Sequence, residues 1–252
     1  MGKKNPDEMT FLEHLEEFRG RLIWVLVTLA VGTAGAYFFS DRLVAFILLP
    51  GGGKLQYIKP AEAFTVHVAV SFLAAAVGTA PVTFFHLWRF ISPALLPKEK
   101  RLVLPFVFAT TLCFVAGVAF GYWMLFPAMA FFRSFETPSL TANWTLGSYT
   151  SLALRLVLIT GLLFESPVLV YFLARLRIVT PSFLLKKWKH ILVGIFVVAA
   201  VVTPGGDVFT QVLLAAPLAV LYVVSIVVAF AAYPRTTDDD DEDGAARRRW
   251  AG

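Results

Sequence analysis

The chain has 252 residues, of which 58% are hydrophobic and only 15% charged, and its formal net charge is +5. Soluble domains carry about 45–50% apolar and about 25% charged residues, so one soluble domain of this length could not bury so much apolar surface. The composition also excludes intrinsic disorder for most of the chain, and the single cysteine, Cys113, excludes a disulfide scaffold. The remaining class is an all-α protein that crosses a membrane several times.

The chain begins with a segment that is predicted to form a short amphipathic helix. Thr10 followed by Glu13 fits a capping box, which starts a helix. Leu12 and Leu15 lie on one face, while acidic residues occupy the others. We therefore expect residues 1–21 to form a unit that lies along the membrane surface ahead of the first span.

Six apolar segments follow, and most of them reach the about 20 residues that a spanning helix needs. The fifth is shorter, because about 13 residues extend only about 20 Å across a hydrocarbon core about 30 Å thick. A span that short must thin the membrane locally or leave a water-filled depression in its surface. The predicted six-helix transmembrane domain, residues 22–232, has its segments at residues 22–39, 64–88, 102–132, 152–176, 191–203 and 208–232.

The basic residues are divided unequally between the two ends of these segments. Six spans put both termini on one side, and that side receives 17 of the 22 lysine and arginine residues. Basic residues stay with the cytoplasm, so both termini are predicted to be cytoplasmic. Topology explains the positive charge, and no nucleic-acid partner is expected. The five basic residues on the other side are Arg42, Lys54, Lys59, Arg133 and Arg155.

The last segment, residues 233–252, differs in composition from the rest of the chain. It carries six consecutive acidic residues at 238–243 and then three arginines at 247–249. Runs of like charge repel themselves and stay solvated, so we predict a disordered cytoplasmic tail.

One acidic residue, Glu165, lies deep in an apolar segment. A charge at the bilayer centre costs at least about 2.5 kcal/mol, so this side chain is expected to face the bundle interior or a wet cavity. Pro167, two residues on, can free backbone carbonyls and admit water. Two interpretations stay open, a polar contact for a substrate or partner helix and an internal hydrogen bond to a neighbouring helix.

The sequence lacks the motifs of common enzyme and cofactor sites. It has no GxxxxGK[ST] phosphate loop and no HExxH, and its four histidines are too scattered for a metal site. We therefore predict no catalytic residue, no metal and no cofactor.

Four short motifs occur in order along the chain. They are HLEEFR at 14–19, FISPAL at 90–95 followed by Glu99, FESP at 164–167 and TPGGDVFTQ at 203–211. Together they resemble the TatC family, the multispanning receptor subunit of the twin-arginine, or Sec-independent, protein translocase. The resemblance covers about residues 10–230 and fits six spans with both termini inside; the acidic tail is not part of it.

The resemblance implies a receptor for folded precursor proteins whose N-terminal signal carries two adjacent arginines. In the family, one acid near the first helix and one in the first cytoplasmic loop read these arginines; by position they are Glu17 and Glu99. A guanidinium meets a carboxylate through two parallel hydrogen bonds, which lysine cannot reproduce. The other signal-peptide-binding residues implied by the resemblance are Arg19, Phe90 and Pro93.

The resemblance also implies partners and an energy source. The family recruits single-helix subunits of the TatA and TatB type into an oligomeric complex in the plasma (inner) membrane of prokaryotes. The transmembrane proton gradient drives it, without a cofactor. Glu165 would then meet polar groups of an inserted signal hairpin or of a partner helix. The residues expected to contact partners or to support the fold are Pro50, Tyr122, Asp207 and Gln211.

Two rival functions stay open on the residues alone. A proton-coupled small-molecule transporter could use Glu165 as a proton relay, but it would usually show internal repeats, and residues 1–120 and 121–240 show none. A structural membrane subunit would have no substrate site. A receptor should prefer an Arg-Arg signal peptide to a Lys-Lys one, and both rivals should be indifferent.

Overall fold

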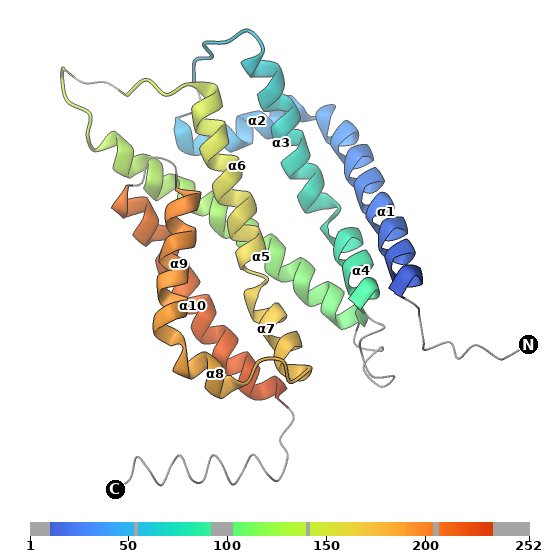
Figure 1. Cartoon of the computed structure of the whole chain (residues 1–252). Coiled ribbons are helices and arrows are strands. Elements are labelled where there is room, and N and C mark those ends of the chain that lie inside the picture. The colour runs from blue at the N-terminus through green and yellow to red at the C-terminus, as the bar shows by residue number, and fades with distance from the viewer. Residues whose placement is uncertain (1–10, 53–54, 92–102, 140–141, 204–206, 234–252) are drawn as a thin grey trace, which may run out of the picture.

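The computed structural model describes residues 11–52, 55–91, 103–139, 142–203 and 207–233, with side chains from His14 onward. Within these ranges the regular elements are helices (Figure 1), and an isolated β-bridge pairs Gln56 with Thr145. The elements are α1 (Phe11–Tyr37), α2 (Ser40–Leu48), the 3-10 helix η1 (Leu49–Gly51), α3 (Glu62–Gly78), α4 (Ala80–Ile91), α5 (Val103–Arg133), α6 (Leu146–Leu163), α7 (Ser166–Arg175), α8 (Pro181–Lys186), α9 (Trp188–Val202) and α10 (Val208–Ala232).

Length and composition allow four of the described helical segments to cross a membrane: most of α1, α5, α6 together with α7, and α10. The bent pair of α3 and α4 makes a fifth if it counts as one span. Helix α9 has 15 residues and is too short for this criterion. The all-helical, multi-pass class is therefore confirmed, whereas a count of six depends on α9 and stays a prediction.

Two of the predicted spans contain a break. The axes of α3 and α4 differ by 57° across Thr79, and Pro81 follows in the first turn of α4. Helices α6 and α7 are separated at Phe164 and Glu165, with Pro167 in the first turn of α7. Proline lacks a backbone N–H and its ring clashes with the preceding turn, so it is favoured in the first turn of a helix and kinks or breaks many helix interiors.

The first helix is longer than the first predicted span. Helix α1 continues from Phe11 to Tyr37, so the boundary predicted at residue 21 does not coincide with a helix end. The boundary predicted at residue 232 coincides with the last residue of α10. The predictions for residues 1–10 and for the acidic tail concern residues outside the described ranges.

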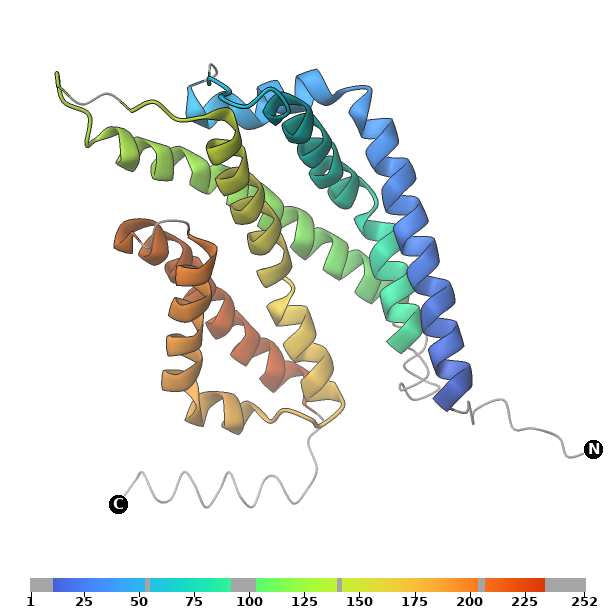
Figure 2. The same cartoon turned by 45° about the horizontal axis from the view of Figure 1, so that its top comes forward.

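Both figures show two well-separated ends of the helical bundle. Helix α1 begins and α4, α7 and α10 end on the side of the bundle where α8 lies, toward the bottom of Figure 1, and we call this side the α8 end. Helix α2 lies at the opposite end, where α3 and α6 begin, and we call this the α2 end (Figure 2). Helix α5 runs obliquely from the end of α4 toward the α2 end (Figures 1 and 2).

Helices α5 and α6 approach each other closely at glycines. A Cβ atom added to Gly117 would lie 2.7 Å from the carbonyl oxygen of Thr160 and 2.7 Å from the Cβ of Phe164. Gly121 faces the backbone of Val157 in the same way, at 2.9 Å. Small residues let two membrane helices pack backbone to backbone, which replaces the hydrophobic driving force that lipid removes. The crossing therefore fixes Phe164, the residue before Glu165.

We expect Gly117→Val to lower the free energy of unfolding by about 1–3 kcal/mol, because the added methyl groups force the two backbones apart. Thermal unfolding of the purified chain in detergent measures the change. Gly35→Val in α1 is the matched control, since a Cβ at Gly35 meets nothing within 4 Å. Equal losses in both variants would contradict the tight α5–α6 crossing.

Candidate functional site

Aromatic residues join the start of α1 to the end of α4 at the α8 end. The rings of His14 and Phe90 are stacked with centroids 4.4 Å apart, and the ring of Phe18 lies 5.1 Å from that of Phe90. Arg19, also on α1, is exposed. Three residues predicted at the signal-peptide site, Glu17, Arg19 and Phe90, thus come from two helices whose ends are in contact.

Glu17 already has a cationic neighbour. Its Oε1 accepts a hydrogen bond from Nη2 of Arg21, one helical turn further on, and its Oε2 lies 4.0 Å from Nδ1 of His14. The side chain of Glu17 is 22% exposed and that of Arg21 is 17% exposed. Among the described residues, Oε2 of Glu17 and Nε of Arg21 have no hydrogen-bond partner. Glu17 is therefore a largely desolvated carboxylate that binds one guanidinium and keeps an acceptor oxygen.

Glu99 and Pro93 lie outside the described residues. The described part of α4 ends at Ile91, directly after Phe90. The distance between Glu17 and Glu99, on which the predicted reading of two arginines depends, therefore stays a prediction.

Glu165 occupies the break between α6 and α7. It stands at the N-cap position of α7 and is partly buried. Its Oε1 is buried and has no hydrogen-bond partner among the described residues. A buried acceptor without a partner is costly, so this oxygen can take a donor from outside the described chain.

Pro50 and Tyr122 make contacts within the fold at the α2 end. Pro50 is buried in η1. The hydroxyl of Tyr122 donates to the carbonyl oxygen of Phe46 at 2.8 Å, and their rings are stacked 4.5 Å apart. These contacts support the structural interpretation for both residues, and a partner contact stays a prediction.

Asp207 and Gln211 hold the start of α10. The carboxylate of Asp207 accepts a hydrogen bond from the backbone N–H of Thr210 at 2.7 Å, which is an N-cap. The side chain of Gln211 donates to the carbonyl oxygen of Phe196 in α9 at 3.0 Å. Both side chains thus support the turn that joins the last two helices.

The sequence analysis missed two polar residues at the α2 end. The buried Tyr149 donates to the carbonyl oxygen of Ile47 at 2.7 Å. Glu62 accepts hydrogen bonds from the backbone N–H groups of Ile58, at 3.0 Å, and Gly147. An acid in the first turn of a helix is a recognisable signal, but its partner 85 residues away is not.

The described residues offer no evident metal centre. They contain no group of three or more His, Cys, Asp or Glu side chains arranged to hold a metal ion.

Comparison with known proteins decides the family. The family model described as "Sec-independent protein translocase protein (TatC)" matches residues 13–217. The chain belongs to the TatC family. It is 36% identical over 236 residues to the "Sec-independent protein translocase protein TatC" of Koribacter versatilis (strain Ellin345), covering 90% of this chain and 87% of that relative. The corresponding protein of Helicobacter pylori (strain J99 / ATCC 700824) is 39% identical over 222 residues, covering 88% of this chain and 89% of the relative.

Solved structures agree with this membership. A crystal structure of the twin-arginine translocase receptor TatC in DDM superposes with a TM-score of 0.79 at 32% identity, covering 86% of this chain and 99% of that chain. A second crystal structure of the TatC receptor gives a TM-score of 0.73 at 33% identity, covering 87% and 99%. The resemblance to TatC drawn from the four motifs is confirmed, and the chain is a multi-pass membrane protein of this family.

We expect Asp207→Ala to destabilise this TatC-family chain by about 1 kcal/mol, because α10 loses its N-cap. Asp207→Asn should retain nearly full stability, since an amide oxygen accepts the same hydrogen bond. The midpoint of thermal unfolding in detergent measures both changes. A loss in Asp207→Asn as large as in Asp207→Ala would show that the charge, rather than the cap, stabilises the turn.

Proposed function

We propose that the chain is the core receptor subunit of a twin-arginine protein translocase. It binds the signal peptides of folded precursors at the α8 end and recruits single-helix subunits of the TatA and TatB type. The proton motive force drives translocation, and the subunit itself catalyses no reaction. Family membership over most of the chain carries this proposal, together with the largely desolvated Glu17 carboxylate beside Phe90.

The pair of Glu17 and Arg21 supports recognition of arginine by this carboxylate. The side chain already holds one guanidinium within the chain, and its second oxygen keeps accepting capacity. An incoming arginine would share or displace Arg21 and form the two parallel hydrogen bonds that lysine cannot form. An incoming cation must therefore compete with Arg21 for the Glu17 carboxylate, and a single weakly binding cation would not displace it.

The second arginine is assigned to Glu99. The aromatic contacts of Phe90 with His14 and Phe18 hold the end of α4 beside the start of α1. Eight residues lead from Ile91 to Glu99 and span at most about 27 Å when extended. This reach is sufficient for Glu99 to approach Glu17, so the two carboxylates can bind adjacent arginines. Arg19 and Pro93 are proposed to shape the same site.

Glu165 is proposed to contact an inserted signal hairpin or a partner helix. Its buried Oε1, which has no partner in the described chain, supports this role. A polar group carried into the membrane on a second helix would satisfy it, and such contacts between membrane helices contribute about 0.6–2 kcal/mol.

We expect Glu17→Gln to weaken the binding of an Arg-Arg signal peptide at least tenfold, because a charge-assisted hydrogen bond contributes about 1.5–3 kcal/mol. The ratio of the affinity for the Arg-Arg peptide to that for the Lys-Lys peptide should fall as well. Binding of labelled Arg-Arg and Lys-Lys peptides to the purified full chain measures both effects.

Glu16→Gln is the matched control, since Glu16 is an exposed neighbour with the same charge. Binding by Glu16→Gln should change less than about twofold, as surface charges contribute little. Charge reversal extends the test to the predicted first cytoplasmic loop, which contains Glu99. Glu17→Lys and Glu99→Lys should each abolish crosslinking of a precursor that carries a twin-arginine signal peptide. Undiminished crosslinking in both would exclude this assignment.

We further propose that both termini are cytoplasmic and that the membrane is the inner membrane of a prokaryote. The unequal distribution of charge between the two ends supports this orientation. The described basic residues at the α8 end are Arg19, Arg21, Arg89, Arg175, Arg177, Lys186, Lys187 and Lys189, whereas those at the α2 end are Arg42, Lys59 and Arg133.

Cysteine labelling in intact cells tests the orientation. In a Cys113→Ala background, a membrane-impermeant thiol reagent should label Tyr57→Cys, which lies at the exposed α2 end. It should label Lys186→Cys in α8 only after the membrane is permeabilised, because the positive-inside rule puts that end in the cytoplasm. The reverse pattern would overturn the proposed orientation.

A further inference from the structure

Arg155 is a charged residue inside a span that the receptor function does not use. It lies on α6, within the candidate span from Leu146 to Arg175, and is exposed. Within the described part of the chain it has no hydrogen-bond, ion-pair or ring partner. An unpaired charge on the surface of a membrane helix is costly and marks a site for an oppositely charged group.

The depth of Arg155 points to the headgroup region at the α2 end. Its Cα lies about 13.5 Å along the helix from Leu146, at about 1.5 Å per residue. The span of 30 residues is about 45 Å long, so centring it on a core of about 30 Å leaves the Cα about 6 Å inside the hydrocarbon. Side chains on a helix lean toward its N-terminus, which for α6 is the α2 end (Figure 1). The guanidinium can therefore extend to the lipid phosphates.

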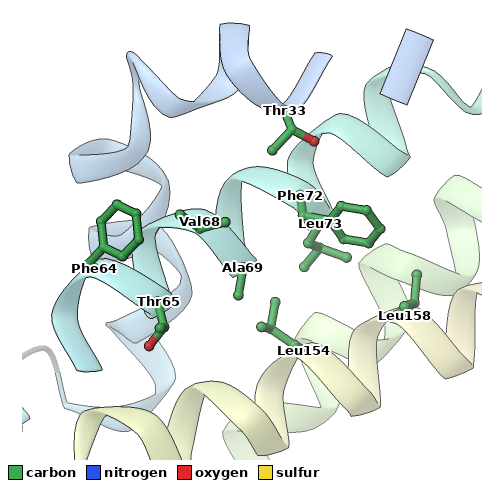
Figure 3. Close-up of a pocket in the computed structure, with 9 residues that line it drawn as sticks. All are labelled: Thr33, Phe64, Thr65, Val68, Ala69, Phe72, Leu73, Leu154 and Leu158. Atoms are coloured by element: carbon green, nitrogen blue, oxygen red, sulfur yellow. The ribbon is translucent and has the colours of Figure 1, made fainter. Parts of the chain in front are cut away.

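The residue before Arg155 and the residue three positions after it line an apolar cavity. Leu154 and Leu158 of α6 face residues of α1 and α3, among them Thr33 and Phe72, around a volume of about 380 Å³ (Figure 3). Residues three apart on a helix are neighbours, so Arg155 stands next to Leu158.

The polar groups of the cavity are already occupied. The hydroxyl of Thr33 donates to the carbonyl oxygen of Leu29 at 2.8 Å, and that of Thr65 donates to the carbonyl oxygen of Glu62 at 2.9 Å. Both are bonds within their own helices. The cavity therefore suits a hydrocarbon chain.

We propose that the cavity and Arg155 together bind an anionic phospholipid of the leaflet at the α2 end. One acyl chain fills the apolar cavity, and the guanidinium holds the phosphate through paired hydrogen bonds, for which arginine is better suited than lysine. The proposal depends on the membrane-spanning fold and is independent of signal-peptide binding.

Native mass spectrometry of the purified full chain tests the site. Phosphatidylglycerol with two oleoyl chains and the diacylglycerol with the same chains are added in separate arms. The unaltered chain should retain phosphatidylglycerol at least tenfold better, because only this lipid carries a phosphate for a charge-assisted hydrogen bond. Equal retention of the two lipids by the unaltered chain would overturn the proposal without any variant.

Variants of Arg155 then test whether its guanidinium binds the phosphate of the lipid. Arg155→Gln should lower phosphatidylglycerol retention about tenfold and leave diacylglycerol retention unchanged. The phosphatidylglycerol retention of Arg155→Lys should lie between those of the unaltered chain and Arg155→Gln. Arg42→Gln is the charge control, since Arg42 is exposed at the same end but does not line the cavity. An equal loss in Arg42→Gln would show a general charge effect and overturn the site.

The cavity is tested by filling it. Ala69→Phe places a ring in the space and should lower the retention of both lipids, whereas Ala200→Phe on the exposed surface of α9 should not. Unchanged lipid retention in Ala69→Phe would exclude the cavity. Displacement of phosphatidylglycerol by millimolar inorganic phosphate would show that the guanidinium binds free phosphate, which would contradict a lipid site.

Discussion

The close crossing of α5 with α6 is the contact on which the rest of the structure depends. In a membrane, apolar surface gains little by leaving lipid for another helix, so association relies on close packing. Gly117 and Gly121 permit this packing because they lack the atoms that would meet Thr160, Phe164 and the α6 backbone. Helix α5 then provides the surface against which other helices pack. Trp88 of α4 stacks on Phe106 at 4.8 Å, and Phe209 of α10 stacks on Phe131 at 4.0 Å.

The two ends of the bundle use polar groups in different ways. At the α2 end the hydroxyls of Tyr122 and Tyr149 donate to α2 carbonyls, and Glu62 ties the start of α3 to α6. These three groups are satisfied within the chain, and they join α2 and α3 to α5 and α6. At the α8 end Glu17 keeps an oxygen without a partner in the described chain. Incomplete satisfaction is expected where a protein binds a partner, because the partner completes the hydrogen bonding.

One break in a candidate span carries an acidic residue. The break at Glu165 interrupts the backbone ladder within the membrane, which is tolerated where the freed groups face protein or a wet cavity. The acidic side chain of Glu165 stands at this break, at the N-cap of α7 and within the candidate span. Glu165 and Arg155 are thus two ionisable positions on one candidate span, the first partly buried and the second exposed.

Much of the architecture was determined by the sequence alone, because hydropathy and segment length depend on local composition. The last span was predicted at 208–232 and α10 has those bounds, and four motifs in order were sufficient to indicate the family. The pair of Glu17 and Arg21 could also have been read from their spacing of four residues.

Only the tertiary structure decided which distant residues meet. The contact of Phe90 with His14 and the hydrogen bond from Tyr149 to Ile47, 102 residues away, depend on how whole helices pack. The 57° bend between α3 and α4 and the unbroken course of α1 past residue 21 were likewise not evident from the sequence. Helix ends and bends are set by neighbouring backbones and side chains, and their energies do not appear in the local pattern of hydrophobic and polar residues.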